Sequence, residues 1–165
     1  MQNVISERQL VEDDWLLLDK DATLEQISDP AQRYIVPLQL WLAQHDSLPG
    51  NKEHYAVWLD ADESPEPLAE HCLQLPLIAI NFPVFSDGRG YSYARVLRDE
   101  YHYTGELRAI GDVLRDQLQF YARCGFNSFA LREDRDASSA VASFDDFSVS
   151  YQAASDDPTP LFRRR

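Results

Sequence analysis

The sequence has few cysteines and no long apolar run. Its two cysteines, Cys72 and Cys124, are too few for a disulfide framework and too far apart for a paired metal-binding knuckle. No apolar stretch approaches the roughly 18 residues of a membrane span. The first residues also lack the basic region and apolar stretch of a secretory signal. We therefore expect a cytoplasmic protein that does not bind membranes.

Basic residues are scarce, and the scarcity is uneven. The 165 residues include 15 Lys and Arg against 28 Asp and Glu, which gives a net charge of -13. Residues 1–80 hold 4 basic and 15 acidic side chains, whereas residues 81–165 hold 11 and 13. Nucleic acids and anionic membranes are bound largely by neutralising phosphate, so we expect neither as a partner. The acidic first half suits a basic protein partner instead.

Lysine is nearly absent, because only Lys20 and Lys52 are lysines and the other 13 basic residues are arginines. The guanidinium group offers a rigid fork of donors that matches carboxylates and oxyanions. Seven arginines lie between residues 87 and 132, together with six acids. This near-balance is typical of ion pairs. One or two of these arginines could instead bind an anion.

Short apolar runs alternate with segments of helical periodicity, and this alternation predicts an α/β fold with a mainly parallel sheet and helical crossovers. About five strands are expected, at residues 34–36, 55–59, 77–82, 106–110 and 126–131. Five strands cannot close an eight-stranded barrel alone. The sheet is therefore either a barrel fragment, whose open edge a partner subunit would cover, or a doubly wound open sheet.

The length fits a single domain. We expect an N-terminal β-hairpin and linker over residues 1–33, with apolar runs at Val4-Ile5 and at residues 15–18, then βα repeats over residues 34–152. An arginine-rich tail follows over residues 153–165. Its apolar pair and three terminal arginines are typical of a docking segment, for which a second subunit of a homodimer is one target. A loose, solvated tail is the alternative.

The loop after the third predicted strand is the first candidate site. In parallel sheets, ligands bind beyond the carboxyl ends of the strands, near helix N-termini. Gly88 and Gly90 flank Arg89 just before a predicted helix, so the backbone could approach an anion that the arginine clamps. The dinucleotide fingerprint and the Lys-Ser/Thr of a nucleotide P-loop are absent. The expected ligand-binding residues are Asp87, Gly88, Arg89, Gly90, Tyr91, Ser92, Arg108, Asp112 and Arg115.

Other chemical groups give no assignable reaction. Asp112 is expected first as a helix cap. The carboxylates after the other strands, such as Asp60 and Asp62, do not match the spacing of a metal site, and the four histidines stand alone in the sequence. Cys124 lies near a predicted helix C-terminus, which indicates a buried thiol rather than a thiolate. The catalytic residues and the cofactor thus remain unassigned, and no metal site is expected.

Three strings of the sequence carry a resemblance to a known family. Residues 82–92, 105–117 and 123–126, together with the ending at residues 160–165, resemble the bacterial domain-of-unknown-function family 934. The resemblance covers nearly the whole chain. Where the family pattern tends to have Asp, this chain has Asn81 and Asn127. An acid-dependent metal role at these two positions is therefore not expected.

The resemblance also implies a role. Members of the family are usually encoded beside a sulfite reductase of the sirohaem and iron–sulfur type, and they are loosely labelled as oxidoreductases of sulfite reduction. The resemblance therefore implies an accessory protein of assimilatory sulfite reduction, which binds the reductase or its electron donor. The alternative is a small enzyme that binds an oxyanion or a phosphorylated metabolite at the Gly88-Arg89-Gly90 loop. The chain itself lacks a dinucleotide fingerprint and the cysteines of an iron–sulfur cluster.

Overall fold

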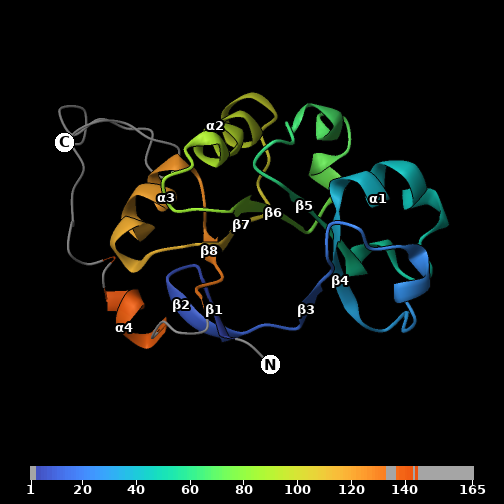
Figure 1. Ribbon diagram of the computed structural model, residues 1–165, viewed down its shortest axis with the longest axis horizontal. Coiled ribbons are helices and arrows are strands. Elements are labelled where there is room, and N and C mark those ends of the chain that lie inside the picture. The colour runs from blue at the N-terminus through green and yellow to red at the C-terminus, as the bar shows by residue number, and fades with distance from the viewer. Residues whose placement is uncertain (1–2, 133–136, 143, 145–165) are drawn as a thin grey trace.

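The computed structural model describes residues 3–132, 137–142 and 144, and its main feature is one curled, eight-stranded sheet (Figure 1). The strand order is β2-β1-β8-β7-β6-β5-β4-β3. Strands β3 to β8 run parallel, and the antiparallel hairpin β1-β2 continues the sheet beside β8. The strands are β1 Asn3–Ser6, β2 Gln9–Glu12, β3 Trp15–Leu17, β4 Arg33–Pro37, β5 Tyr55–Leu59, β6 Leu77–Phe82, β7 Glu106–Gly111 and β8 Ser128–Phe129.

Short helices connect the parallel strands. They are α1 Leu38–Gln44, α2 Arg89–Arg95, α3 Leu118–Cys124 and α4 Ala137–Ala142, and a π-helical turn at Val96–Glu100 continues α2. The remaining helical segments are 3₁₀ turns at Leu24–Gln26, His45–Ser47, Lys52–His54, Glu66–Leu68, Cys72–Gln74 and Arg115–Gln117. The segment after Pro65 contains two of these turns, at Glu66–Leu68 and Cys72–Gln74, and it buries Leu68 and Cys72.

The fold is α/β, as the alternation of strands and helices predicts, and the five predicted strands correspond to β4–β8. The predicted hairpin is wrong in its second strand. β1 pairs with β2 across a tight turn at Glu7 and Arg8, whose φ angles are 49° and 63°. The apolar run that begins at Trp15 instead forms β3, which pairs in parallel with β4 at the opposite edge.

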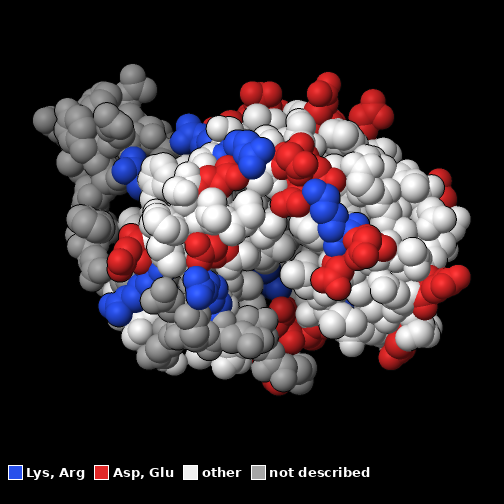
Figure 2. Space-filling view, in the orientation of Figure 1, with Lys and Arg blue, Asp and Glu red and all other residues white. Residues whose placement is uncertain are grey.

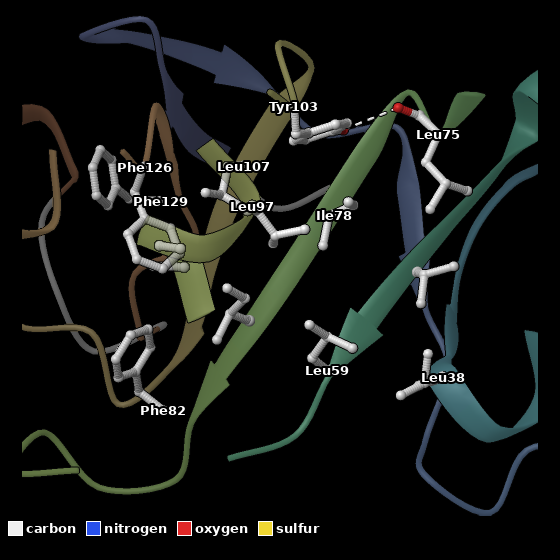
Figure 3. Packing of buried hydrophobic residues seen from close by; sticks show 14 of the residues in the cluster. Leu38, Leu59, Leu75, Ile78, Phe82, Leu97, Tyr103, Leu107, Phe126 and Phe129 are labelled. Atoms are coloured by element: carbon white, nitrogen blue, oxygen red, sulfur yellow. Dashed lines mark hydrogen bonds between the residues drawn. The ribbon is translucent and has the colours of Figure 1, made fainter. Parts of the chain in front are cut away.

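The sheet has two unlike faces. The covered face packs against the helices through side chains such as Leu107 and Ile78 from the strands and Leu97 from the π turn (Figure 3). The hydroxyl of Tyr103 closes one end of this layer by donating to the carbonyl of Leu75, at 3.0 Å. The inner face carries a smaller cluster, whose described members all come from strands or their immediate ends: Ile35, Ala56, Trp58, Leu77, Ala79 and Ile110, flanked by Trp15 and Ala130. A doubly wound sheet, with helices on both faces, is therefore the wrong alternative.

A very short link joins the two edges of the sheet. β2 and β3 are the edge strands, yet only Asp13 and Asp14 separate them in the sequence. Three Cα–Cα steps of about 3.8 Å hold Glu12 and Trp15 within about 11 Å of each other. The sheet must therefore curl into a half-barrel. Figure 1 shows the helices around the outside of the curl and the blue segment from β1 to β3 along its lower side.

The chain ends lie partly outside the described residues. α4 and the buried Phe144 belong to the predicted βα repeats, whereas the arginine-rich tail over residues 153–165 lies outside the described residues. Gly125 ends α3 with a φ of 117°. No helix in the described part of the chain has the length and apolar character needed to cross a bilayer.

Candidate functional site

The loop after β6 holds the predicted anion clamp at the carboxyl end of the sheet. The guanidinium of Arg89 donates to both carboxylate oxygens of Asp87, at 3.1 and 2.7 Å. This ion pair, together with the Arg89 backbone N–H, lowers the pKa of Asp87. Arg89 stays more than half exposed, with 55% of its side chain accessible. An anion at this loop would therefore share or displace an existing carboxylate partner.

Some of the other predicted loop residues pack against the sheet, and others are exposed to solvent. Nothing lies within 4 Å of a Cβ placed at Gly88, whereas one placed at Gly90 would lie only 2.6 Å from the Phe82 ring. Gly90 thus lets α2 approach β6 closely. Tyr91 packs its ring against Phe82, with the two centroids 5.1 Å apart, and Ser92 is exposed. Only part of the predicted loop is therefore accessible to a ligand.

Asp112 follows β7 at the same carboxyl end of the sheet, but it does not cap a helix. The predicted cap is wrong, because the helical segment begins at Arg115 and its N-cap residue is Leu114. The Asp112 carboxylate instead accepts from the Phe85 backbone N–H and from Arg132, both at 3.0 Å. Asp112 thus joins the β6 loop to the segment after β8.

Arg108 lies at the centre of the inner face, on β7. Only 3% of the residue is exposed. Its Nη1 donates to both oxygens of Asp13 at 3.0 Å, and its Nη2 donates to Glu106 at 2.7 Å. Its Nε also donates to the Ser128 hydroxyl, at 3.1 Å. We call these four residues the inner-face network.

The inner-face network borders a cavity of about 500 Å³. Its lining comes from the β2–β3 link, from β3 and from the inner face: Asp13, Asp14, Trp15, Leu16, Leu17, Gln32, Ile35, Arg108, Ile110 and Ala130. The Arg108 cation already faces two carboxylates, so the network carries a net negative charge. A polar or cationic group suits this cavity better than an oxyanion does.

The structure does not bring the three predicted arginines together. Arg108 lines the inner-face cavity, whereas Arg89 and Arg115 are not among its lining residues. Arg89 lies in the β6 loop, and Arg115 is exposed in the turn before α3. Arg108 is therefore separate from the β6 loop, and a pocket that all three arginines line is not seen in the described part of the chain.

A row of hydrogen-bonded polar side chains at the carboxyl ends of β5 and β6 was not predicted from the sequence. Lys20 binds Asp60 at 2.7 Å, and Asp60 accepts from the Asn81 amide at 3.0 Å. Burial raises the pKa of Asp60, but hydrogen bonds from Lys20, Asn81 and the Ala61 N–H outweigh it, so the pKa is lowered overall. The sequence shows Asp60 at the end of a predicted strand. It does not show that Lys20, 40 residues earlier, is its partner.

Metal and thiol chemistry find little support in the described residues. Within residues 3–132, 137–142 and 144, no group of three or more His, Cys, Asp or Glu side chains is placed to hold a metal ion. Cys72 and Cys124 are both buried and free of disulfides. Burial raises the pKa of the Cys72 thiol. Neither thiol therefore has the surroundings of a reactive cysteine.

Comparison with known protein families gives a match. A family model described as "Bacterial protein of unknown function (DUF934)" matches residues 56–162. No curated protein and no solved structure shows significant similarity to the chain. The matched region begins within β5 and includes the β6 loop, Arg108 and Asp112. The hairpin, β3 and Asp13 precede it.

Proposed function

Because the chain belongs to the DUF934 family of bacterial proteins of unknown function, we propose that it is an accessory protein of assimilatory sulfite reduction. In this proposal the chain binds the reductase or its electron donor and does not itself carry out the redox step. The pathway comes from the resemblance to the family. The mode of action rests on the charge distribution of the surface.

The acidic surface of the first half carries the proposal. We define it as the exposed carboxylates of residues 19–70, which are Asp19, Asp21, Glu25, Asp29, Asp46, Glu53, Asp62, Glu66 and Glu70. Figure 2 shows acidic side chains around the end of the molecule that holds α1, and most basic side chains toward the centre and the opposite end. A one-signed surface of this kind steers a partner of opposite charge and orients it before contact.

The few cations of this region offset the acidic surface only in part, because Lys20 pairs with one of its members, Asp62. Lys20 is engaged by Asp60 and Asp62, and Arg33 is engaged by Asp14. Lys52 donates to the carbonyl of His45. In the second half, several described arginines also form ion pairs with carboxylates of this chain, and Arg95 with Asp99 is one example. These pairings favour a basic protein partner over a small anionic ligand.

The test is binding to the sulfite reductase and its electron donor from the same organism. We expect association to weaken when the salt concentration rises from about 50 to about 300 mM, because added salt screens exposed charges. The variant Asp21→Lys/Glu70→Lys should bind at least about tenfold more weakly. The matched control Glu100→Lys/Asp116→Lys alters exposed acids outside the acidic surface and should bind like the wild type.

Two results would overturn the proposal. One is the absence of both binding and any change in sulfite turnover when the chain is added to the reductase system. The other is equal loss of binding in the two charge variants, which would make the location of the carboxylates irrelevant.

The oxyanion-binding alternative rests on the exposed half of Arg89 and the open space at Gly88. A thermal-shift titration with sulfite, sulfate and phosphate tests it. A bound anion at 100 times its dissociation constant would stabilise the fold by about 2.7 kcal/mol. If the anion raises the melting temperature of Arg89→Ala as much as that of the wild type, the β6 loop is not the anion-binding site.

A further inference from the structure

In the described part of the chain, the hairpin strand β2 is an edge strand that pairs only with β1, and α4 contacts both strands of the hairpin. All four of its residues are exposed, including Leu10 at 39% and Val11 at 37%. Natural sheets usually protect an edge with lysine, proline, a bulge or a covering element. Gln9-Leu10-Val11-Glu12 contains neither lysine nor proline, and its register with β1 is uninterrupted. Within residues 3–132, 137–142 and 144, the outer side of this strand has no paired strand, and its two apolar side chains are partly exposed.

The hairpin register defines which backbone groups point outward. Ser6 and Gln9 flank the two-residue turn, so they form a hydrogen-bonded pair, and the pair type alternates along the strands. Gln9 and Val11 therefore direct their backbone groups toward β1. Leu10 and Glu12 direct theirs away from the sheet. The Glu7 N–H, which donates to Asn127 on the β8 side at 2.9 Å, follows the same alternation.

The charges on this strand are complementary to those of a second copy. Antiparallel pairing of β2 with β2 of another molecule must match outward-pointing residues with each other. Centred on Leu10, this register places Leu10 against itself and Arg8 of each copy beside Glu12 of the other. Opposite charges on facing strands stabilise such a pair. The contact between Arg8 and Glu12 occurs twice, and the contact between the two Leu10 side chains lies on the two-fold axis.

Repulsion between two molecules of net charge -13 is reduced at this place. Asp13 and Asp14 follow β2 directly, but Arg108 pairs with Asp13 and Arg33 pairs with Asp14. Arg8 lies in the turn before β2, with its guanidinium over the Phe144 ring, and Glu12 lies at the far end of the strand. These cations offset part of the negative charge beside β2, although Arg108 also faces Glu106 and the inner-face network stays net negative.

From these observations we infer that the chain forms a two-fold homodimer in which the β2 strands pair antiparallel about Leu10. The pairing joins the two curled sheets into one continuous sheet and satisfies the outward backbone groups of Leu10 and Glu12. Because β2 has only four residues, the interface buries little surface, and we expect dimerisation to depend on protein concentration. The inference rests on the hairpin alone and is independent of the proposed function.

Sedimentation velocity of the purified full-length chain over a range of concentrations tests the dimer. We expect a species of twice the 19.0 kDa chain mass to grow with concentration. Leu10→Pro removes an N–H that β1 does not use, so it should abolish the dimer while far-UV circular dichroism stays unchanged. The matched control is Leu16→Arg at the other exposed edge, on β3, which should leave the dimer intact.

A charge exchange makes the test specific to the register. Arg8→Glu and Glu12→Arg should each weaken the dimer by about tenfold, because each places like charges together twice. The double variant Arg8→Glu/Glu12→Arg should restore it. Mixing the two single variants should give a heterodimer, since one chain then carries two acidic side chains at these positions and the other carries two basic ones.

Several outcomes would overturn the inference. A chain that stays monomeric at its highest soluble concentration has no such dimer. A dimer that persists in Leu10→Pro, or that is lost in Leu16→Arg instead, uses another surface. Failure of the charge exchange to restore association excludes the Leu10-centred register, and a complex containing a different protein at this edge excludes a second copy as the occupant.

Discussion

The two faces of the sheet are stabilised by different kinds of contact. The covered face is a continuous apolar layer in which strand side chains meet the helices. The inner face has alanines at Ala56 and Ala79, and two large polar-tipped side chains cross it. Trp58 donates to the carbonyl of Leu18 at 2.9 Å, and Arg108 reaches Asp13. A sheet face on which the described residues place no helix can thus be covered by one short chain segment, provided that polar contacts fix that segment in place.

The strand register explains the spacing of these contacts. Trp58 of β5, Ala79 of β6 and Arg108 of β7 are direct neighbours across the inner face. The inside of a curl offers less room than the outside, so a small residue between two large ones relieves crowding. Ala79 therefore leaves space for both side chains to reach residues 13–18.

The largest expected effect comes from removing the cation of the inner-face network. Arg108→Met keeps the side-chain length but leaves the Asp13 and Glu106 carboxylates facing each other, and it should cost about 3–5 kcal/mol of unfolding free energy. Urea unfolding measures this. Arg89→Met, at an exposed ion pair, should cost less than about 1 kcal/mol. Equal losses in the two variants would show that the network does not stabilise the inner face.

The next comparison uses two residues of the same strand. Leu107 of β7 is fully buried on the covered face, and Ile110 lies on the inner face beside the cavity. Leu107→Ala should cost about 3–4 kcal/mol, and Ile110→Ala about 2 kcal/mol, because the second site already has open space on one side. Urea unfolding with matched m-values measures both. The reverse order would mean that the inner face is the better packed of the two.

The smallest expected effect concerns the indole that crosses the inner face. Trp58→Phe keeps an aromatic ring but removes the N–H that donates to Leu18, and it should cost about 1–2 kcal/mol. Thermal unfolding and hydrogen exchange at residues 15–18 measure the effect. We expect faster exchange in this segment while the covered face stays protected. Unchanged exchange would contradict the bridging role of the indole.

The sequence predicts the parallel strands well because burial on both faces makes them almost continuously apolar. Residues 77–82 are such a case, and they form β6. The second hairpin strand could not be found in this way. Gln9 to Glu12 are all exposed, so no burial periodicity marks them. The run at Trp15 was assigned to the hairpin because nothing local shows that it crosses to the other edge of the sheet.

The candidate site was predictable in its residues more than in its geometry. A charged Arg108 inside an apolar strand stands out in the sequence, and it proves to be almost fully buried. Its partner Asp13 lies 95 residues earlier, a separation that no spacing rule reaches. Asp87 and Arg89 pair with each other within the predicted loop. Binding of a ligand at that loop stays a prediction.

The short link between β2 and β3 also bears on how the chain is made. β1 and Asp13 are synthesised about 100 residues before their partners β8 and Arg108. At about 5–20 residues per second, they wait roughly 5–20 s for these partners. During that time β1 and β2 cannot join the sheet, because β8 is the strand that attaches them, whereas β3 can already pair with β4. The hairpin is thus made early and incorporated late, and a chaperone that acts on the nascent chain would meet it before it is attached to the sheet.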